Sequence, residues 1–262
     1  MIVLSRKRAW NSNVKQAQIP FPRNINDEMK ALCKSNVTVV AYHTNDPFYT
    51  HEAKRLYASA VRLNIDVDIT VVDSYGDWVK NTSFKSSFLE KKRKEIRGPI
   101  LYVDVDAIFH RSPLESLVNI ECDIAVCHHL QDGHLMSGTL FLQDTPMAMD
   151  LMNKWSKSCK ERVNVWDQKV LQDLLIADKA LKKPNYQIVN LPIEYCWIFD
   201  SVCTLNQNVE KIYIEHLQAS RSIKEEERLK NKFFWLGIRK KSVQRRIDRV
   251  SEVEKILFSK SC

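Results

Sequence analysis

The sequence is poor in glycine, with five among 262 residues. It has no Gly-rich loop that could cradle phosphates, because neither a G-x-G-x-x-G pattern nor a Walker A sequence occurs. Long apolar runs are missing too, since no stretch approaches the roughly 18–20 apolar residues that a membrane span needs. These absences argue against a Rossmann-type dehydrogenase and a P-loop protein, and we expect no membrane-spanning segment.

Neither a secretory signal nor a disulfide framework is visible. The opening Met1-Ile2-Val3-Leu4 is interrupted at once by basic residues, whereas a signal peptide needs about 7–15 apolar residues. Seven cysteines, an odd number without repeated spacing, are typical of reduced thiols in the cytoplasm. Cys122, Cys127, His128 and His129 do not predict a zinc site, because the two cysteines would lie on opposite faces of a strand.

Positive charge is concentrated near the C-terminus. The formal net charge is +8, and residues 219–262 contain 13 Lys/Arg against 6 Asp/Glu, which leaves the first 218 residues close to neutral. A basic appendage on a neutral body indicates a polyanionic partner, such as nucleic acid or an anionic membrane surface. A solvated charged helix is the alternative interpretation.

Apolar runs of strand length alternate with amphipathic segments along the middle of the chain. Strands are expected at residues 37–42, 65–72, 100–103, 122–126, 139–142, 188–191 and 211–214, and helices at 51–63, 88–96, 146–158 and 168–176. Thr50 could cap the first helix. Pro20 and Pro22 indicate an irregular arm over residues 1–36. The alternation predicts an α/β fold with a mostly parallel sheet flanked by helices.

Two Asp-x-Asp sequences stand in different contexts. Asp66 and Asp68 lie within an alternating strand, where a solvated strand face explains them. Asp104 and Asp106 instead follow the four apolar residues 100–103. At the carboxyl end of a buried parallel strand, residues i and i+2 point the same way, toward the crevice where open α/β sheets bind ligands. Two carboxylates there favour a divalent cation, Mn²⁺ or Mg²⁺, which could in turn hold a diphosphate.

The segment Ile100-Leu101-Tyr102-Val103-Asp104-Val105-Asp106-Ala107-Ile108-Phe109 resembles the DxD segment of GT-A fold nucleotide-sugar glycosyltransferases. Further elements follow in the order of that family, particularly the retaining lipopolysaccharide galactosyltransferase and glycogenin group. Ser137-Gly138-Thr139 resembles the N-S-G segment that lines the sugar pocket, although Met136 stands where Asn is usual. The resemblance covers residues 37–221 and implies a GT-A catalytic domain there, between the arm and a basic, aromatic-containing extension at 222–262.

The resemblance also implies roles for individual residues. The cation would be held by Asp104, Asp106 and His216. The nucleotide-sugar donor would be bound by residues at several strand ends and helices: His43, Thr44, Lys85, Asp104, Val105, Gly138 and Arg221. The Trp166-Asp167-Gln168 segment is similar to the D-Q pair of the retaining enzymes, which implies catalytic roles for Asp167 and Gln168.

Several of these residues have simpler interpretations. Asp167 could cap the helix that follows it, His216 could be an ordinary strand-end histidine, and Lys85 could be a surface lysine. Gly138 could serve only to permit a bend. These alternatives remain open from the sequence alone.

The expected function is a metal-dependent transfer of a sugar from a nucleoside-diphosphate sugar, a UDP-sugar by the resemblance, to an acceptor hydroxyl with retention of configuration. A nucleotide-sugar pyrophosphorylase is a rival, but its Gly-rich signature is absent. A non-enzymatic binding module on the same fold would need to have lost the cation ligands, which are present.

The acceptor is predicted from the C-terminal extension, where Phe233-Phe234-Trp235-Leu236 lies among Lys and Arg residues. An interfacial helix on anionic lipid would suit a cell-surface or lipid-linked glycan, and would place the protein at the inner membrane face. The alternative is a basic face that follows the phosphates of DNA bearing a hydroxymethylated base, as in phage DNA-modifying glycosyltransferases.

Overall fold

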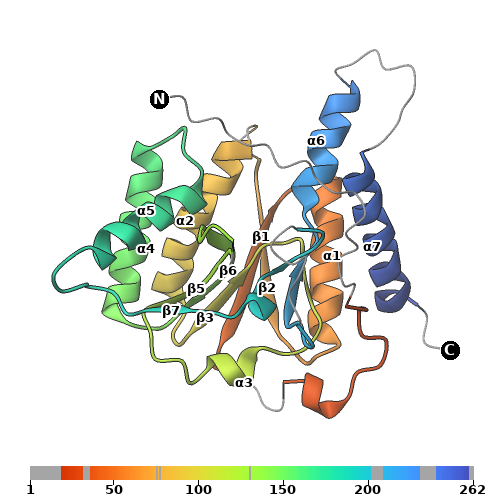
Figure 1. Ribbon diagram of the computed structural model, residues 1–262, viewed down its shortest axis with the longest axis horizontal. Helices are drawn as coiled ribbons and strands as arrows, with labels where there is room; N and C mark the ends of the chain where they lie inside the picture. Colours follow the sequence, from red (N-terminus) through yellow and green to blue (C-terminus); the bar gives the residue numbers. More distant parts are fainter. Residues whose placement is uncertain are drawn as a thin grey trace.

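A six-stranded sheet with helices on both faces forms the body of the protein (Figure 1). The computed structural model describes residues 19–31, 36–74, 76, 78–129, 131–201, 209–230 and 240–259. The strand order is β2 (Val67–Val72), β1 (Thr38–Thr44), β3 (Ile100–Val103), β6 (Leu135–Leu142), β5 (Ile124–His128) and β7 (Ile188–Asn190). Only β6 runs against its neighbours. The predicted α/β fold with a mostly parallel sheet is confirmed.

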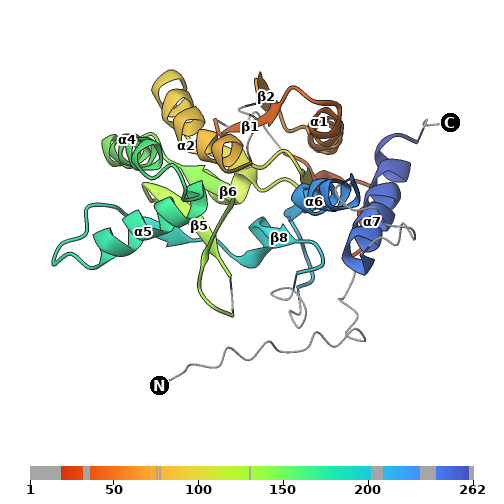
Figure 2. The same cartoon turned by 90° about the horizontal axis from the view of Figure 1, so that it is seen from above.

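The central strands are buried on both faces, which explains their continuous apolar sequences. Along β1 and β3, Val39 and Leu101 pack into one core and Val40 and Ile100 into the other. Helix α1 (Pro47–Val61) covers the first face. The second face is covered by α2 (Trp78–Glu95), α4 (Pro146–Glu161) and α5 (Asp167–Lys179). Figure 2 shows this layering from above.

A smaller three-stranded sheet lies beside the first, with the order β4 (Ala107–Phe109), β9 (Ile214–His216) and β8 (Trp197–Ile198). Short helices connect these parts: α3 (Leu114–Leu117) and 3₁₀ turns at Asp27–Met29 and Ile193–Tyr195. The chain ends in α6 (Ala219–Lys230) and α7 (Lys241–Leu257). None of the helices in the described ranges has both the length and the hydropathy that crossing a membrane requires.

Three predicted helix starts are wrong. Helix α2 begins at Trp78, ten residues before the predicted start at residue 88. Helix α1 begins at Pro47, and Asp46 caps it by accepting a hydrogen bond from the Tyr49 N–H at 2.9 Å, so Thr50 is not the cap. Proline fits the first turn because the missing N–H would have no intrahelical partner there. Helix α5 begins at Asp167 itself and has Trp166 as its N-cap, which excludes the capping interpretation of Asp167.

Helix α7 is packed onto the body through buried arginines. Arg246, 4% exposed, donates to Glu52 of α1 at 2.5 Å, and Arg249 donates to Glu215 of β9 at 2.7 Å. Val253 completes a small apolar cluster with Phe21 and residues of the second sheet. Part of the positive charge counted in the C-terminal extension is therefore used inside the protein. The Phe233–Leu236 cluster lies outside the described residues.

Candidate active site

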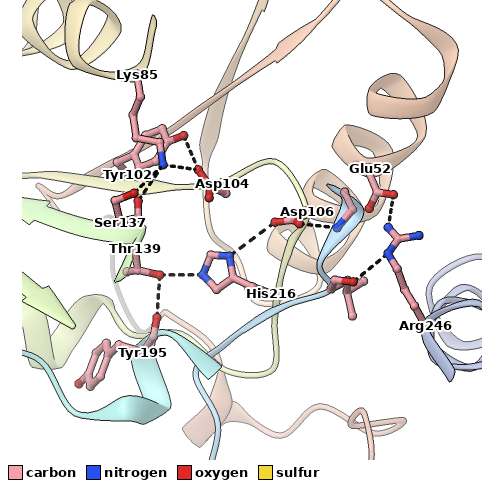
Figure 3. Close-up of polar contacts among 12 residues, drawn as sticks. Glu52, Lys85, Tyr102, Asp104, Asp106, Ser137, Thr139, Tyr195, His216 and Arg246 are labelled. Atoms are coloured by element: carbon pink, nitrogen blue, oxygen red, sulfur yellow. Dashed lines mark hydrogen bonds and ion pairs between the residues drawn. The ribbon is translucent and has the colours of Figure 1, made fainter. Parts of the chain in front are cut away.

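The two aspartates lie in the turn that joins β3 to β4. Asp104 donates its backbone N–H to the Gly138 carbonyl at 2.8 Å, and its own carbonyl accepts from Ala107 at 2.9 Å, which closes the turn. The strand therefore ends before Asp104. The sequence pattern predicted that Asp106 would continue the strand, but Asp106 lies in the turn. The turn nevertheless brings ligand atoms of Asp104, Asp106 and His216 within 4.8 Å of one another (Figure 3).

The start of α6, much later in the chain, fixes the position of Asp106. Its Oδ2 accepts the N–H of Ala219, the first residue of α6, at 2.8 Å. The positive end of a helix stabilises a carboxylate in this position. Burial would raise the pKa of Asp106, but the His216 ring, the Ala219 N–H and Arg246 lower it below the usual range. Asp106 is therefore an ionised, partly covered carboxylate.

His216 is oriented by a relay of hydrogen bonds. Thr139 Oγ1 donates to the Tyr195 carbonyl at 2.8 Å, so this hydroxyl has no proton left for His216 Nε2, 2.9 Å away. It must accept from Nε2–H, which turns Nδ1 toward Asp106 Oδ1 at 3.6 Å. Burial would lower the pKa of His216, but the Cys196 sulfur and Asp106 raise it to about 10.

Gly138 makes room for this cluster. A Cβ atom at this position would lie 3.0 Å from His216 Cε1, 3.2 Å from His216 Nδ1 and 3.4 Å from Asp104 Oδ2. The glycine is thus explained by close approach and not by an unusual backbone conformation. Two carboxylates, one imidazole and a space that a methyl group would fill suit an oxygen-preferring divalent cation such as Mn²⁺ or Mg²⁺.

Lys85 is a buried cation between two carboxylates, not a surface lysine. Its Nζ lies 3.0 Å from Asp104 Oδ1 and 3.5 Å from Asp167 Oδ2, and it donates to the Ser137 carbonyl at 3.0 Å. Burial would lower the pKa of Lys85, but the two aspartates raise it above its usual value. The ammonium group remains charged and links α2, β3 and α5.

Asp167 and Gln168 lie together at the start of α5. The Asp167 carboxylate is buried, which raises its pKa, while Lys85 opposes that rise and Asp104 adds to it. Gln168 Oε1 accepts from the Ser137 N–H at 3.2 Å. Both side chains therefore face the first residues of β6, beside Lys85.

His43, Thr44 and Val105 lie near the same edge and are largely covered. His43 Nδ1 donates to the Thr44 carbonyl at 2.9 Å, and Thr44 Oγ1 donates to Asp46 Oδ2 at 2.6 Å. Val105 is 7% exposed, between the two aspartates. The Nδ1 atom of His43 and the hydroxyl of Thr44 thus have partners within the protein.

Arg221 is directed toward another carboxylate. Its guanidinium donates to Asp200 Oδ2 at 2.8 Å and to the Asp200 carbonyl at 3.1 Å, and Arg245 of α7 binds the same carboxylate at 2.8 and 2.9 Å. Asp200 holds a positive-φ backbone conformation, with φ of 53°. The structure thus places Arg221 in a link between α6, α7 and the segment after β8.

Sequence reasoning assigned no individual role to three residues that shape the site, although two of them lie in the segment that resembles N-S-G. Tyr102 OH donates to Asp104 Oδ1 at 2.7 Å, Thr139 orients His216, and Ser137 contacts both Lys85 and Gln168. The signal for Tyr102 is a hydroxyl two residues before the aspartate in a strand, on the same face. No local signal could identify Thr139, because its partners lie 56 and 77 residues away.

The acidic cluster and the buried Lys85 lie where open α/β sheets bind ligands, at the carboxyl ends of the strands. The chain belongs to the nucleotide-diphospho-sugar transferase family, whose family model matches residues 95–230. It is a glycosyltransferase of the GT-A type that uses a nucleotide-sugar donor. The match begins before β3 and ends with α6, and it contains all three residues of the acidic cluster.

The fold is similar to that of a solved glycosyltransferase structure. The chain is similar to a glycosyltransferase involved in the glycosylation of the major capsid of PBCV-1, with a TM-score of 0.53, 13% identity, and coverage of 73% of this chain and 98% of that one. It also matches GlyE of Streptococcus pneumoniae TIGR4 (TM-score 0.48, 15% identity, 68% of this chain and 54% of that one). The galactosyltransferase LgtC matches at 0.43, with 13% identity, 68% of this chain and 86% of that one. No curated protein matches the sequence. The first of these three structures alone has a TM-score above 0.5, and at 13% identity it supports the fold and nothing further.

Proposed function

We propose that this glycosyltransferase uses a UDP-sugar, requires Mn²⁺ or Mg²⁺, and transfers the sugar with retention to a hydroxyl of a cell-surface or lipid-linked glycan. The observation that carries the proposal is the convergence of Asp104, Asp106 and His216 beside a buried, charged Lys85. These three residues would hold the cation. A cation bound there would neutralise negative charge on the diphosphate leaving group.

Lys85 would contribute a second positive charge to the leaving group. Its ammonium is held by Asp104, Asp167 and the Ser137 carbonyl and does not have to reorganise during the reaction. The phenol of Tyr102, which donates to Asp104, would keep that carboxylate turned toward the cluster. The protein thus offers a preorganised positive site for a group that becomes more negative as the sugar bond breaks.

The proposed retention depends on Asp167 and Gln168. Glutamine is a poor nucleophile, so Gln168 would position the anomeric centre without forming a covalent bond to it. Its Oε1 is fixed by the Ser137 N–H, and the neighbouring Asp167 carboxylate is buried against Lys85. Asp167 would hold hydroxyl groups of the donor sugar.

A glycan acceptor is favoured over DNA because basic residues of the C-terminal extension form ion pairs within the protein. Arg245, Arg246 and Arg249 of α7 bind internal carboxylates and are not available to follow a phosphate backbone. Among the described basic residues of the extension, Lys224, Lys240, Lys241 and Lys255 remain exposed, and Lys240 and Lys241 are adjacent at the start of α7. We propose that these two adjacent lysines contact an anionic glycan or membrane surface, with the protein at the inner face of the membrane.

Assays of donor hydrolysis and transfer test this proposal. Release of UDP from UDP-sugars should require Mn²⁺ or Mg²⁺ and stop with EDTA, and NMR of the product should show the donor's anomeric configuration. Transfer should occur to lipid-linked glycan and not to hydroxymethylated duplex DNA. Turnover in EDTA would refute the metal requirement, inversion would refute the role of Gln168, and transfer to DNA would replace the glycan acceptor.

The exposed lysines have a separate test. Replacing Lys240 and Lys241 together by Gln should lower transfer to the anionic acceptor and leave donor hydrolysis unchanged, because both lie away from the acidic cluster. Lys157→Gln, at an exposed position of α4, is the matched control. Equal transfer by all three proteins would show that these lysines only keep the surface charged.

A further inference from the structure

A second cluster of cation-binding side chains lies in the hairpin between β5 and β6. It consists of His129, Asp132 and His134, whose ligand atoms all lie within 4.8 Å of one another. The Nδ1 atoms of His129 and His134 lie 2.9 Å and 2.6 Å from the same Asp132 oxygen. The two imidazole rings are stacked, with centroids 4.5 Å apart and planes at 18°. No residue of this cluster belongs to the donor site.

The polar atoms of this cluster are incompletely satisfied. His129 Nδ1 is buried and makes no hydrogen bond of acceptable geometry among the described residues, although Asp132 Oδ1 is near. Two ring nitrogens therefore face one oxygen, and only His134 is aligned to bond to it. A buried ring nitrogen without a hydrogen bond is costly, and a cation between the three ligand atoms would remove that cost.

Backbone hydrogen bonds close the hairpin, and one cluster side chain adds to them, because Asp132 Oδ1 accepts the His134 N–H at 3.3 Å. The His129 N–H donates to the His134 carbonyl at 2.8 Å, and the Gly133 N–H donates to the His129 carbonyl at 2.8 Å. Gly133 has φ of +70°, which glycine adopts without strain. The two imidazoles and the carboxylate are thus held on a closed turn, and single substitutions among them should leave the turn intact.

The ligand atoms of this cluster favour a different cation from the ligand atoms of the nucleotide-sugar donor site. Two imidazoles and one carboxylate suit Zn²⁺, Cu²⁺ or Ni²⁺, whereas two carboxylates with a diphosphate suit Mg²⁺ or Mn²⁺. The side chains of His129, Asp132 and His134 are 14%, 61% and 42% exposed, so an ion can reach them from solvent. Three protein ligands also leave a coordination position for water.

The hairpin lies at the same edge of the sheet as the donor site. Strands β3 and β5 both run against β6, so their carboxyl ends meet at one edge. In Figure 2 the hairpin extends beyond the sheet, between α5 and β8. The strand that follows it carries Ser137, which contacts Lys85 and Gln168. A cation in the hairpin would therefore stiffen the start of the strand that supports the donor site.

We propose that His129, Asp132 and His134 form a second metal site, which binds a transition-metal cation such as Zn²⁺ independently of the donor-site cation. This site differs from the set of two cysteines and two histidines that the sequence analysis considered and rejected as a zinc site. Cys122 and Cys127 are buried free thiols, and only His129 is common to both sets.

Zinc binding to the full-length, chelator-treated protein tests the proposal. The Asp106→Asn variant serves as the parent, so that the donor site does not contribute. Equilibrium dialysis against Zn²⁺ should show one bound ion in this parent. Adding His134→Gln should weaken binding by about tenfold or more, because a direct ligand is lost. Adding His128→Gln, which alters a neighbouring histidine outside the cluster, should leave binding unchanged.

Electron paramagnetic resonance with Cu²⁺ gives an independent readout. The parent should show coupling to two imidazole nitrogens, and the His134→Gln protein should show one or none. No zinc bound to the parent, equal binding with and without His134→Gln, or an equal loss with His128→Gln would overturn the proposal. Circular dichroism of each variant identifies a change of fold, in which case the exposed Asp132→Asn replaces His134→Gln.

Discussion

Single side chains at the donor site have two tasks, to supply charge and to leave space. Asp106 supplies a charge that is held by a backbone N–H of α6, and Gly138 leaves space by having no side chain. These tasks can be separated by substitution, because one change alters charge at constant volume and the other alters volume at constant charge.

Asp106→Asn should lower cation-dependent transfer by at least about 100-fold, since even residues that support metal ligands are worth about 10–100-fold. The fold should persist, because the amide oxygen of Asn can still accept the Ala219 N–H. Activity measured against Mn²⁺ concentration, together with the melting temperature of the metal-free protein, checks both statements. Near-normal Mn²⁺-dependent turnover would remove Asp106 from the proposed ligands.

Gly138→Ala should raise the Mn²⁺ concentration needed for half-maximal activity without unfolding the protein. The new methyl group would approach His216 Cε1 to 3.0 Å, and the neighbouring ring would have to shift away from Asp106. Combining the change with His216→Ala should be less harmful than the sum of the two changes, because the smaller side chain removes the crowding. Additive losses would show that Gly138 acts elsewhere.

At the scale of helices and strands, the sequence predicted the sheet better than the helix ends. Residues 100–103 were predicted as a strand with the bounds observed, because a fully buried strand is apolar throughout. Tyr57 and Val61 lie on the apolar face of the first helix in the sequence pattern, yet they are 56% and 52% exposed. The predicted start was too late, since Pro47 and the capping Asp46 were not recognised. Strands β4 and β8 are too short to have a periodic pattern.

The basic extension illustrates a second limit of sequence patterns. Arginines that reach buried carboxylates give the same local pattern as arginines that face solvent. Arg246 is separated from Glu52 by 194 residues, and Arg249 from Glu215 by 34. No local spacing identifies such partners. The convergence of Asp104, Asp106 and His216 was predicted because strand ends and a known motif order mark them, whereas Arg221 was assigned by order alone.

Arg246→Met should destabilise the protein by about 3–5 kcal/mol, because it removes a partner from a buried ion pair. Glu52, 1% exposed, would retain Arg55 and lose Arg246. Urea unfolding measures the change, and Lys241→Gln at the exposed start of α7 is the control, expected within about 0.5 kcal/mol of wild type. Equal free energies of unfolding for all three proteins would show that the packing of α7 contributes little to the stability of the protein.

For the whole molecule, the buried charges make stability depend on pH. Burial lowers the pKa of His110, although Glu215 at 2.8 Å opposes this, and Arg249 adds to the lowering. The unfolded chain therefore binds a proton near pH 6.5 more readily than the folded protein does. The contribution of His110 to the free energy of unfolding is highest above pH 6.5 and falls as the pH decreases from there toward the folded pKa.

His110→Gln should flatten this decline, since glutamine can donate to Glu215 and does not titrate. The slope attributable to His110 cannot exceed about 1.4 kcal/mol per pH unit, the value for one proton. Urea unfolding of wild type and variant between pH 7 and pH 5 gives the two slopes, and their difference isolates this residue. Identical slopes would mean that His110 titrates alike in the folded and unfolded states.

The contact between the first N–H of α6 and Asp106 has a practical consequence for shortened forms of the protein. A chain cut after Arg221, where the motif resemblance ends, would lose nearly all of α6 and the whole of α7. Glu52 and Glu215 would lose arginine partners, and the apolar side chains of Phe199 and Leu217 would lose the cover of Val253. We expect such a fragment to aggregate on expression, so a minimal active enzyme should retain α6 and α7.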